Sequence, residues 1–395
     1  MISFDEATAL VRSIAQPLGT EHVGIAQAAG RVLAAPVLAQ IASPRTDVSA
    51  MDGYAVREAD LENLPARLLV TSESFAGAGS RVPVGAGECA RVFTGSPLPP
   101  KIDRVVMQEN VRRQGDLAII DQHPGPARHV RARAGDFEVG DELLATGRLL
   151  DARAIVAAAG ADVADLLVFA RSRVTILSTG DELAEPGTAA GIEDAIPESV
   201  SFGVAALAEQ WGAAVVARLR LPDDLPHMRP VAEQAIGQSD VLVVTGGASV
   251  GEKDFAKRMF DEAGLELIFS NVAIKPGKPV WIGRVGKTLI VGLPGNPTSA
   301  LVTARLLLAP LLCGLSGRNT DDALRWHRAP LLARLAQCGG RETFHRARWA
   351  DHEVDVLPNQ DSSAQRVLAA ADLLVRQRAH SPELLEGEAV DVLDF

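Results

Sequence analysis

Cysteine and paired histidine are scarce in this sequence. Its three cysteines, Cys89, Cys313 and Cys338, are scattered through 395 residues, and none belongs to a C-x-x-C pair. This spacing argues against a disulfide framework and against a cysteine-type zinc site. None of the eight histidines has a second histidine at H-x-x-x-H spacing. We therefore expect the histidines to be structural or exposed, and not metal ligands.

Basic charge is also in short supply, because 39 Lys and Arg stand against 50 Asp and Glu, which gives a net charge of −11. A chain without a basic surplus cannot neutralise a nucleic-acid backbone, so we expect no nucleic-acid partner. An acidic protein that binds anions has to bind them locally, through placed lysines, helix dipoles or a metal ion.

Export and membrane signals are lacking as well. The N-terminal sequence MISFDEATALV does not have the basic and then apolar order of a signal peptide. The longest apolar stretch, residues 300–315, contains Arg305 and Pro310 and is predicted to be too short to cross a bilayer. We expect a cytoplasmic protein with no membrane partner.

Helical patterns occur in two separate parts of the N-terminal half. Residues 3–16 are predicted to form an amphipathic helix that begins with a capping box of Ser3 and Glu6. A second helix is predicted over residues 25–35, and a third over residues 147–160. The intervening chain is rich in Gly, Pro and Val with short alternating runs, which is typical of a small inserted β-domain.

Strands and helices alternate regularly from residue 173 onward. Strands are predicted over residues 174–178, 214–221, 241–244 and 288–293, with helices between them. This series predicts a parallel sheet with helices on both faces, and ligands in such sheets bind beyond the carboxyl ends of the strands. After residue 317 the pattern changes to short β-like segments, which predict a second small β-domain.

Residues 240–297 carry the strongest functional pattern. The strand at 241–244 leads into the glycine loop TGGASVGEKDF, followed by a helix predicted over 252–264. The strand at 288–293 leads into PGNP, where we expect Asn296 to cap a helix that begins at Pro297. Between them, KPGKP holds Lys275 and Lys278 in a proline-stiffened segment. Glycine loops, helix N-termini and paired lysines together predict a site for anions, most plausibly phosphates.

Six motifs occur in the order typical of one family. They are SAMDGYAV (49–56), FTGSPLP (93–99), STGDEL (178–183), GGASVGEKD (246–254), KPGKP (275–279) and GLPGNPTS (292–299). In these the chain resembles the MoeA/gephyrin family of molybdopterin molybdenumtransferases over almost its whole length.

The resemblance implies a multidomain α/β plus β fold. A helical linking and dimerisation domain would comprise residues 1–43 and 132–170, with an inserted β-domain at 44–131. A MogA-like α/β catalytic domain with a parallel sheet would follow at 171–318, and a C-terminal β-barrel at 319–395. The family forms homodimers, which the Ala- and Leu-rich helices around residues 155–161 and 298–312 also favour.

The implied activity is insertion of molybdate into adenylylated molybdopterin with release of AMP, assisted by Mg²⁺. Implied partners are a MogA-like adenylyltransferase and apo-molybdoenzymes. By resemblance the catalytic residues are Asp52, Thr94, Asp136, Glu182 and Asp254, with Asp52 completing the site across the dimer. The metal would be held by Asp181, Glu182 and Asp254, since Mg²⁺ prefers carboxylates, waters and phosphate oxygens. Cofactor-binding residues would be Gly246, Gly247, Ser249, Gly251, Lys275, Lys278, Pro294, Gly295, Asn296, Ser299, Arg346 and Ser362.

Each of these residues also has a purely structural interpretation. Asp181 follows a strand and could equally be a helix cap. Asp52 precedes Gly53 and could be a turn residue. Lys275 and Lys278 could be ordinary surface lysines, although the prolines around them argue for placed charges.

Three positions depart from the family pattern. Val200 follows Glu198 and Ser199 where the family usually has an asparagine, and an aliphatic side chain cannot replace an amide that both donates and accepts. Asn271 stands where a lysine is usual, which predicts weaker anion binding and a gain on changing Asn271 to Lys. Asp361 replaces a glycine before Ser362. Two functions therefore stay open at this stage, the transferase and a diverged, non-catalytic paralogue that binds molybdopterin or acts as a dimeric scaffold.

Overall fold

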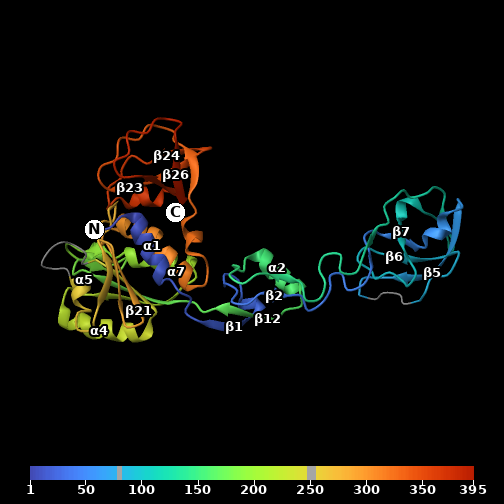
Figure 1. Cartoon of the computed structure of the whole chain (residues 1–395), viewed down its shortest axis with the longest axis horizontal. Coiled ribbons are helices and arrows are strands. Elements are labelled where there is room, and N and C mark those ends of the chain that lie inside the picture. The colour runs from blue at the N-terminus through green and yellow to red at the C-terminus, as the bar shows by residue number, and fades with distance from the viewer. Residues whose placement is uncertain (78–81, 247–254) are drawn as a thin grey trace.

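The computed structural model describes residues 1–77, 82–246 and 255–395. Figure 1 shows a chain extended along one axis, with an α/β body and a C-terminal β-structure together at one end. A small linking segment lies in the middle, and a separate β-sheet lies at the far end. Both chain termini are at the α/β end.

The α/β body is built on a sheet of six strands. Their order is β16 (Ala214–Leu221), β13 (Arg173–Thr179), β17 (Val241–Thr245), β21 (Thr288–Leu293), β20 (Trp281–Val285) and β18 (Glu266–Ser270). The first four strands are parallel, as predicted, but β20 is antiparallel to both of its neighbours, β21 and β18. A tight turn at Gly286 (φ 58°) joins β20 to β21, and so short a connection permits only antiparallel pairing.

Helices cover both faces of this sheet, as the strand–helix alternation predicted. One face packs against α1 (Phe4–Ile14), α3 (Val200–Gln210), α6 (Pro297–Thr303) and α7 (Ala309–Leu315). The other face packs against α4 (Leu225–Gln238) and α5 (Phe255–Arg258). The capping box of Ser3 and Glu6 is present at the start of α1, so this prediction is confirmed.

The helices α6 and α7 are joined by a π-helical turn, η5 (Ala304–Leu308), into one run of 19 residues, Pro297–Leu315. This run is long enough and apolar enough to cross a membrane, so the expectation that the stretch is too short is wrong. Its most apolar window is 94% buried, however, because the run forms the centre of the α/β core.

Two predicted helices are much shorter in the structure. Of residues 252–264, the described part forms a helix only at α5 and then turns to Gly264 (φ 80°). Of residues 25–35, only the 3-10 turn η1 (Ile25–Gln27) is helical. Gly30 has a φ of 74°, and Val32 and Leu33 then form bridges to Leu149 and Val168. These apolar residues bury themselves as extended chain, which overrides the helical pattern.

The linking segment contains more strand than its predicted helical character implied. It pairs β1 (Thr20–Gly24) with β12 (Asp165–Phe169) and β2 (Val37–Leu38) with β11 (Glu142–Leu144). Its helix α2 (Ala152–Gly160) starts later than predicted because the Asp151 carboxylate caps it through the Ala154 N–H at 2.9 Å. The helix α1 packs on the α/β core and not here.

The distal sheet has six strands. Their order is β7 (Arg104–Met107), β4 (Gly53–Val56), β6 (Glu88–Val92), β5 (Ala66–Ser74), β9 (Leu117–Ile120) and β8 (Arg112–Gln114). Below it, β3 (Val48–Ser49) pairs with β10 (Val130–Arg131). This confirms strands at the alternating runs of the sequence near residues 90 and 105.

The C-terminal part is a closed sheet, as the predicted barrel required. Its strands are β19 (Ile274–Lys275), β23 (Glu342–Ala350), β24 (Glu353–Val356), β25 (Leu373–Gln377), β26 (Ala389–Asp394) and β22 (His327–Pro330). A bridge between Leu331 and Val354 joins the end of β22 to β24 and closes the ring. Because β19 pairs with β23, the KPGKP segment begins on this barrel.

Candidate active site

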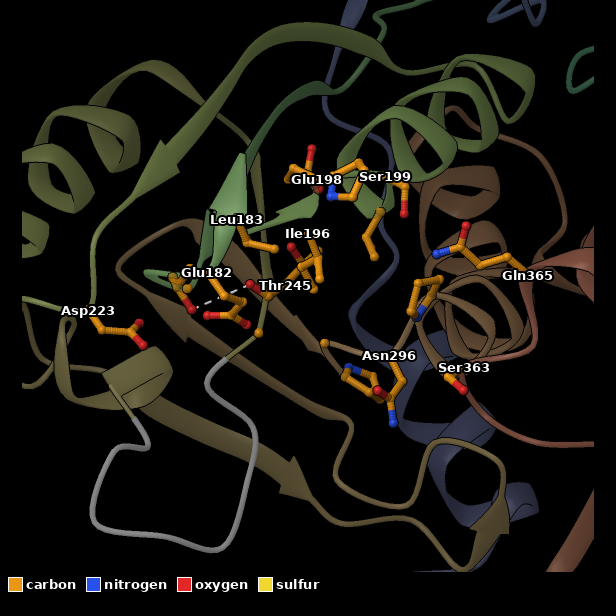
Figure 2. A pocket seen from close by; sticks show the side chains of 18 of the residues that line it. Glu182, Leu183, Ile196, Glu198, Ser199, Asp223, Thr245, Asn296, Ser363 and Gln365 are labelled. Carbon is orange, nitrogen blue, oxygen red and sulfur yellow. Dashed lines mark hydrogen bonds between the residues drawn. The ribbon is translucent and has the colours of Figure 1, made fainter. Parts of the chain in front are cut away.

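A cleft of about 730 Å³ lies at the carboxyl ends of β13, β17 and β21. Figure 2 shows Glu182, Leu183 and Asp223 on one side of it and Asn296, Ser363 and Gln365 on the other. The position agrees with the expectation that ligands bind beyond the strand ends of an α/β sheet.

The backbones of two strand-end loops meet at the base of the cleft. Gly246 has a φ of 91°, and a Cβ there would lie 2.4 Å from the carbonyl oxygen of Thr179. A Cβ on Gly295 would lie 3.4 Å from the Cα of Gly246. Gly246 is therefore required by the packing of the protein backbone itself, in addition to any approach of a ligand.

A buried polar network forms one wall of the cleft. The Glu198 carboxylate accepts hydrogen bonds from the N–H of Ser201 at 2.8 Å, from the Ser201 hydroxyl and from the Ser178 hydroxyl at 3.3 Å. Thr245 at the end of β17 donates in turn to Ser178 at 3.1 Å. In the sequence, Glu198 stands out only as part of the departure from the family pattern at residues 198–200. An acid three residues before Ser201 at a helix start is the signal that could have identified it.

Acidic side chains line the rim of the cleft. Glu182 is exposed and faces it, and Asp181 accepts the N–H of Asp223 at 3.0 Å. Asp181 thus binds a backbone N–H in the turn after β16. This agrees with a structural role for Asp181, although the N–H belongs to a turn and not to a helix start. In residues 1–77, 82–246 and 255–395, no three His, Cys, Asp or Glu side chains gather closely enough to hold a metal. The predicted residues Gly247, Ser249, Gly251 and Asp254 lie outside the described residues.

A second hollow, of about 580 Å³, adjoins the cleft, and Pro279 lines both. Lys275, Lys278, Ser299 and Ser362 line it together with Arg341. A Cβ on Gly277 (φ 96°) would lie 2.1 Å from the Thr303 methyl group, so the KPGKP turn packs directly on α6. Both lysines are exposed, and Ser299, in the first turn of the helical run that starts at Pro297, lines the same hollow. The dipole of that helical run favours an anion near its first turn.

Side chains of the barrel complete this hollow. Asn296 occupies the N-cap position of α6, but its side chain makes no capping bond and donates to the Ser362 hydroxyl at 2.9 Å. The expected helix start at Pro297 and N-cap position of Asn296 are therefore confirmed, but the side-chain capping bond typical of such a residue is not formed. The backbone carbonyl of Ser362 accepts the Thr298 N–H at 3.2 Å.

Arg346 lies behind the second hollow. Its side chain is 1% exposed and donates to the carbonyl oxygen of Asp361 at 3.2 Å. Burial lowers the pKa of the Arg346 guanidinium to about 10. Its Nε atom has no hydrogen-bond partner in the part of the chain that the structure describes.

Asn271 lies outside both hollows. It has a φ of 64°, its N–H donates to Val280 at 3.0 Å and its carbonyl oxygen accepts the N–H of Ile2 at 3.1 Å. Asparagine tolerates this left-handed conformation better than lysine does. The backbone conformation therefore explains why asparagine stands at position 271. The expected loss of an anion-binding charge does not explain it, because Asn271 lines neither hollow.

Three predicted catalytic residues lie on elements remote from the α/β body of the same chain. Asp52 and Thr94 adjoin β4 and β6 of the distal sheet, and Asp136 lies beside α2 of the linking segment; Figure 1 shows both parts apart from the α/β body. The Asp52 Oδ1 atom, at the start of β4, accepts both the N–H and the hydroxyl of Thr94, at 2.7 and 2.8 Å. These two bonds lower the pKa of Asp52. Asp136 instead lines a hollow of about 710 Å³ in the linking segment, beside Arg153.

Three family profiles together match most of the chain. The MoeA N-terminal region (domain I and II) matches residues 2–161. A profile described as a probable molybdopterin binding domain matches residues 175–313, and the MoeA C-terminal region (domain IV) matches residues 328–395.

Curated relatives and solved structures agree with these profiles. A molybdopterin molybdenumtransferase from Haemophilus influenzae is 33% identical over 85% of this chain and 82% of its own length. Molybdopterin molybdenumtransferase 2 from Mycobacterium tuberculosis is 34% identical over 94% of each chain.

Two crystal structures of the molybdopterin biosynthesis MoeA protein from Pyrococcus horikoshii superpose with TM-scores of 0.83 and 0.85, at 28% and 24% identity. They cover all of this chain and 99% and 100% of their own. The chain thus belongs to the MoeA family of molybdopterin molybdenumtransferases, and its role lies in molybdenum cofactor biosynthesis.

Proposed function

We propose that this chain inserts molybdenum from molybdate into adenylylated molybdopterin and releases AMP, acting in the cytoplasm. The observation that carries the proposal is the pair of adjoining hollows at the start of α6. The larger cleft has room for a nucleotide joined to a pterin, and the smaller one presents two lysines to a compact oxyanion. Among the residues that the structure describes, no feature favours the non-catalytic alternative.

Molybdate would bind in the smaller hollow. Lys275 and Lys278 supply point charges, and the N-terminus of a helical run of 19 residues adds its dipole. The hydroxyls of Ser299 and Ser362 lie in the same wall and can donate to the remaining oxygens. The phosphates of the nucleotide would lie in the larger cleft, near Gly246, Pro294 and Gly295.

Magnesium fits the donor set on the rim of the larger cleft. Mg²⁺ takes one or two carboxylates and completes its shell with waters and phosphate oxygens, so it does not need a closed protein cage. Asp181, Glu182 and Asp254 are the residues that would hold it. When bound, the cation would offset the negative charge of the phosphoanhydride and polarise it for cleavage.

A homodimer would bring Asp52, Thr94 and Asp136 to the site. All three are distant from the cleft of their own chain (Figure 1), so a second copy has to supply them if they act there. Val156 on α2 and Val139 nearby are exposed apolar residues of the linking segment, as an interface between copies requires. A MogA-like adenylyltransferase would supply the adenylylated pterin, and apo-molybdoenzymes would receive the product.

The decisive experiment is reconstitution of an apo-molybdoenzyme with adenylylated molybdopterin, molybdate and the purified chain. We expect AMP release and active enzyme with the wild type. The double change of Lys275 and Lys278 to Gln should raise the molybdate KM by at least tenfold, while Lys287→Gln, in the turn after β20, should not. Wild-type protein that binds the pterin but releases no AMP would contradict the proposal. Light scattering should return twice the 41.6 kDa chain mass.

A further inference from the structure

Four planar groups stack at one end of the distal sheet. The Arg91 guanidinium carbon lies 5.0 Å from the ring centre of Tyr54 and 5.0 Å from that of Phe93. The rings of Phe93 and Phe75 are stacked, with centroids 4.8 Å apart and planes inclined by 14°. We name Tyr54, Arg91, Phe93 and Phe75 the aromatic stack. It runs from a residue that is 7% exposed, Tyr54, to one that is 45% exposed, Phe75.

Strand register produces this arrangement. Tyr54 on β4 pairs with Arg91 on β6, and Phe93 follows two residues later on the same face of the sheet. Ser74 on β5 pairs with Val92, so Phe75 stands beside Phe93 where both strands end. Asp52 lies in the bend just before β4, and its hydrogen bonds with Thr94 hold it near the end of β6, where Thr94 directly follows Phe93.

The polar group beside the stack is a hydrogen-bond acceptor. Thr94 occupies the Oδ1 atom of Asp52, and within residues 1–77, 82–246 and 255–395 no hydrogen bond reaches its Oδ2 atom. The Arg91 guanidinium already donates to the carbonyl oxygen of Gly53 at 3.2 Å and to Gln108 at 2.5 Å. The stack thus combines an exposed ring, that of Phe75, with an acceptor at Asp52, whose partner Thr94 directly follows Phe93 in the chain.

We infer that the aromatic stack binds the pterin ring of the substrate, an inference that rests on the function proposed above. Planar heterocycles stack on exposed aromatic rings, and this favours either the pterin or the adenine. The carboxylate distinguishes them. A pterin carries two adjacent N–H donors, on its amino group and its ring nitrogen, and either can donate to the free Oδ2 atom with no ring acceptor turned toward Asp52. Adenine sets a ring acceptor beside its amino donor, and that acceptor would face Asp52 unfavourably.

The stack would serve the cleft of a second copy of the chain. The strands that carry the stack lie at the opposite end of the molecule from the α/β body (Figure 1). The cleft is at the strand ends of that α/β body. A substrate whose phosphates occupy the cleft of one copy would then extend its pterin to Phe75 and Asp52 of the other. The inserted sheet would in this way bind the pterin ring, and the α/β body would bind the phosphates and the oxyanion.

The test measures binding without turnover. Pterin-6-carboxylate is fluorescent, so its quenching can be followed as the full-length chain is titrated. We expect Phe75→Ala and Phe75→Leu to weaken its binding roughly tenfold, as loss of one stacking ring predicts, and Phe75→Trp to retain it. Asp52→Asn should weaken it as well. Trp349→Ala removes an exposed ring that stacks on His327 in the barrel, and it should bind like the wild type.

AMP provides the second arm. Its affinity, measured by calorimetry, should be the same for the wild type and for Phe75→Leu. The inference is overturned if pterin-6-carboxylate does not bind, if it binds Phe75→Leu at wild-type strength while the melting temperature is unchanged, or if Phe75→Leu weakens AMP in place of the pterin. Reconstitution separates this result from the proposed function. A wild type that releases AMP but does not bind pterin-6-carboxylate would refute only the role of the stack.

Discussion

The side-chain amide of Asn296 donates a hydrogen bond of 2.9 Å to the hydroxyl of Ser362. Asn296 belongs to the loop after β21, and Ser362 to the barrel segment before α8 (Gln365–Ala369). This bond therefore connects the α/β body to the barrel at the wall between the two hollows. It positions the Ser362 hydroxyl at the edge of the lysine-lined hollow.

The first prediction concerns this link. Asn296→Ala should raise the molybdate KM roughly twofold to tenfold, as loss of one net hydrogen bond implies, with little change in melting temperature. Stability should be spared because the Asn296 side chain makes no capping bond. Asn319→Ala is the matched control, since Asn319 does cap a 3-10 turn through the Asp321 N–H at 3.0 Å. It should lower stability and leave the molybdate KM alone. The reverse pattern would show that Asn296 acts as a cap.

The second prediction concerns the buried Glu198. A glutamine there can keep an oxygen for the Ser201 N–H, but its N–H₂ group would then meet the Ser201 hydroxyl, to which Arg218 already donates at 3.2 Å. Glu198→Gln should therefore lower the free energy of unfolding by about 1–3 kcal/mol in urea titrations. Glu209→Gln, an exposed position on the same helix, should change it by less than about 0.5 kcal/mol. Equal effects of the two changes would remove the special role of the network.

Much of the α/β body could be predicted from sequence because its strands are apolar on both sides. The run at 241–244 is fully buried in β17, and such runs read as central strands whatever surrounds them. The predictions that were wrong concern segments whose structure is determined by contacts with residues distant in the sequence or by a single turn. Val32 and Leu33 lie in a helical pattern but form bridges to distant residues, and β20 is antiparallel because of one turn at Gly286.

The candidate site was predictable in part for a similar reason. Lys275 and Lys278 stand in a stretch whose prolines restrict the backbone, and both line one hollow, as paired anion ligands should. The position of Glu198 depends on the side-chain network that it joins, which sequence spacing does not reveal. The distance of Asp52 from the cleft follows from the extended shape of the whole chain, which no local pattern encodes (Figure 1).

The third prediction is a specific acid sensitivity. His345 in β23 is largely buried; its Nε2 atom lies 2.9 Å from the Gln377 amide oxygen, and its Nδ1 atom has no partner among the described residues. Burial lowers the pKa of His345, and nearby Arg346 and Lys275 add to this. The imidazole is therefore neutral in the folded protein near pH 7.

The sign of the effect follows from proton linkage. Above its ordinary pKa of about 6.5, His345 is neutral in both states and stability does not depend on it. As pH falls below that value, the unfolded chain takes up a proton that the folded protein resists, so stability is lost. Relative to His345→Gln, the wild type should lose up to about 1.4 kcal/mol between pH 7.5 and 5.5. His352→Gln, at an exposed position, should follow the wild type. Parallel curves for wild type and His345→Gln would refute the prediction.

The fourth prediction reverses what the sequence suggested for Asn271. By charge alone, Asn271→Lys should add a cation near the lysine-lined hollow and tighten molybdate binding. The structure argues otherwise, because Asn271 lines neither hollow and holds a φ of 64°. Lysine pays a steric cost in this conformation of about 1 kcal/mol more than asparagine does. Asn271→Lys should therefore lower the free energy of unfolding by about that amount and leave the molybdate affinity unchanged in calorimetric titrations. Asn271→Gly, which tolerates a positive φ, should keep wild-type stability. If Asn271→Lys instead tightened molybdate binding tenfold, the charge would outweigh the backbone, and the hollow would have to extend to Asn271.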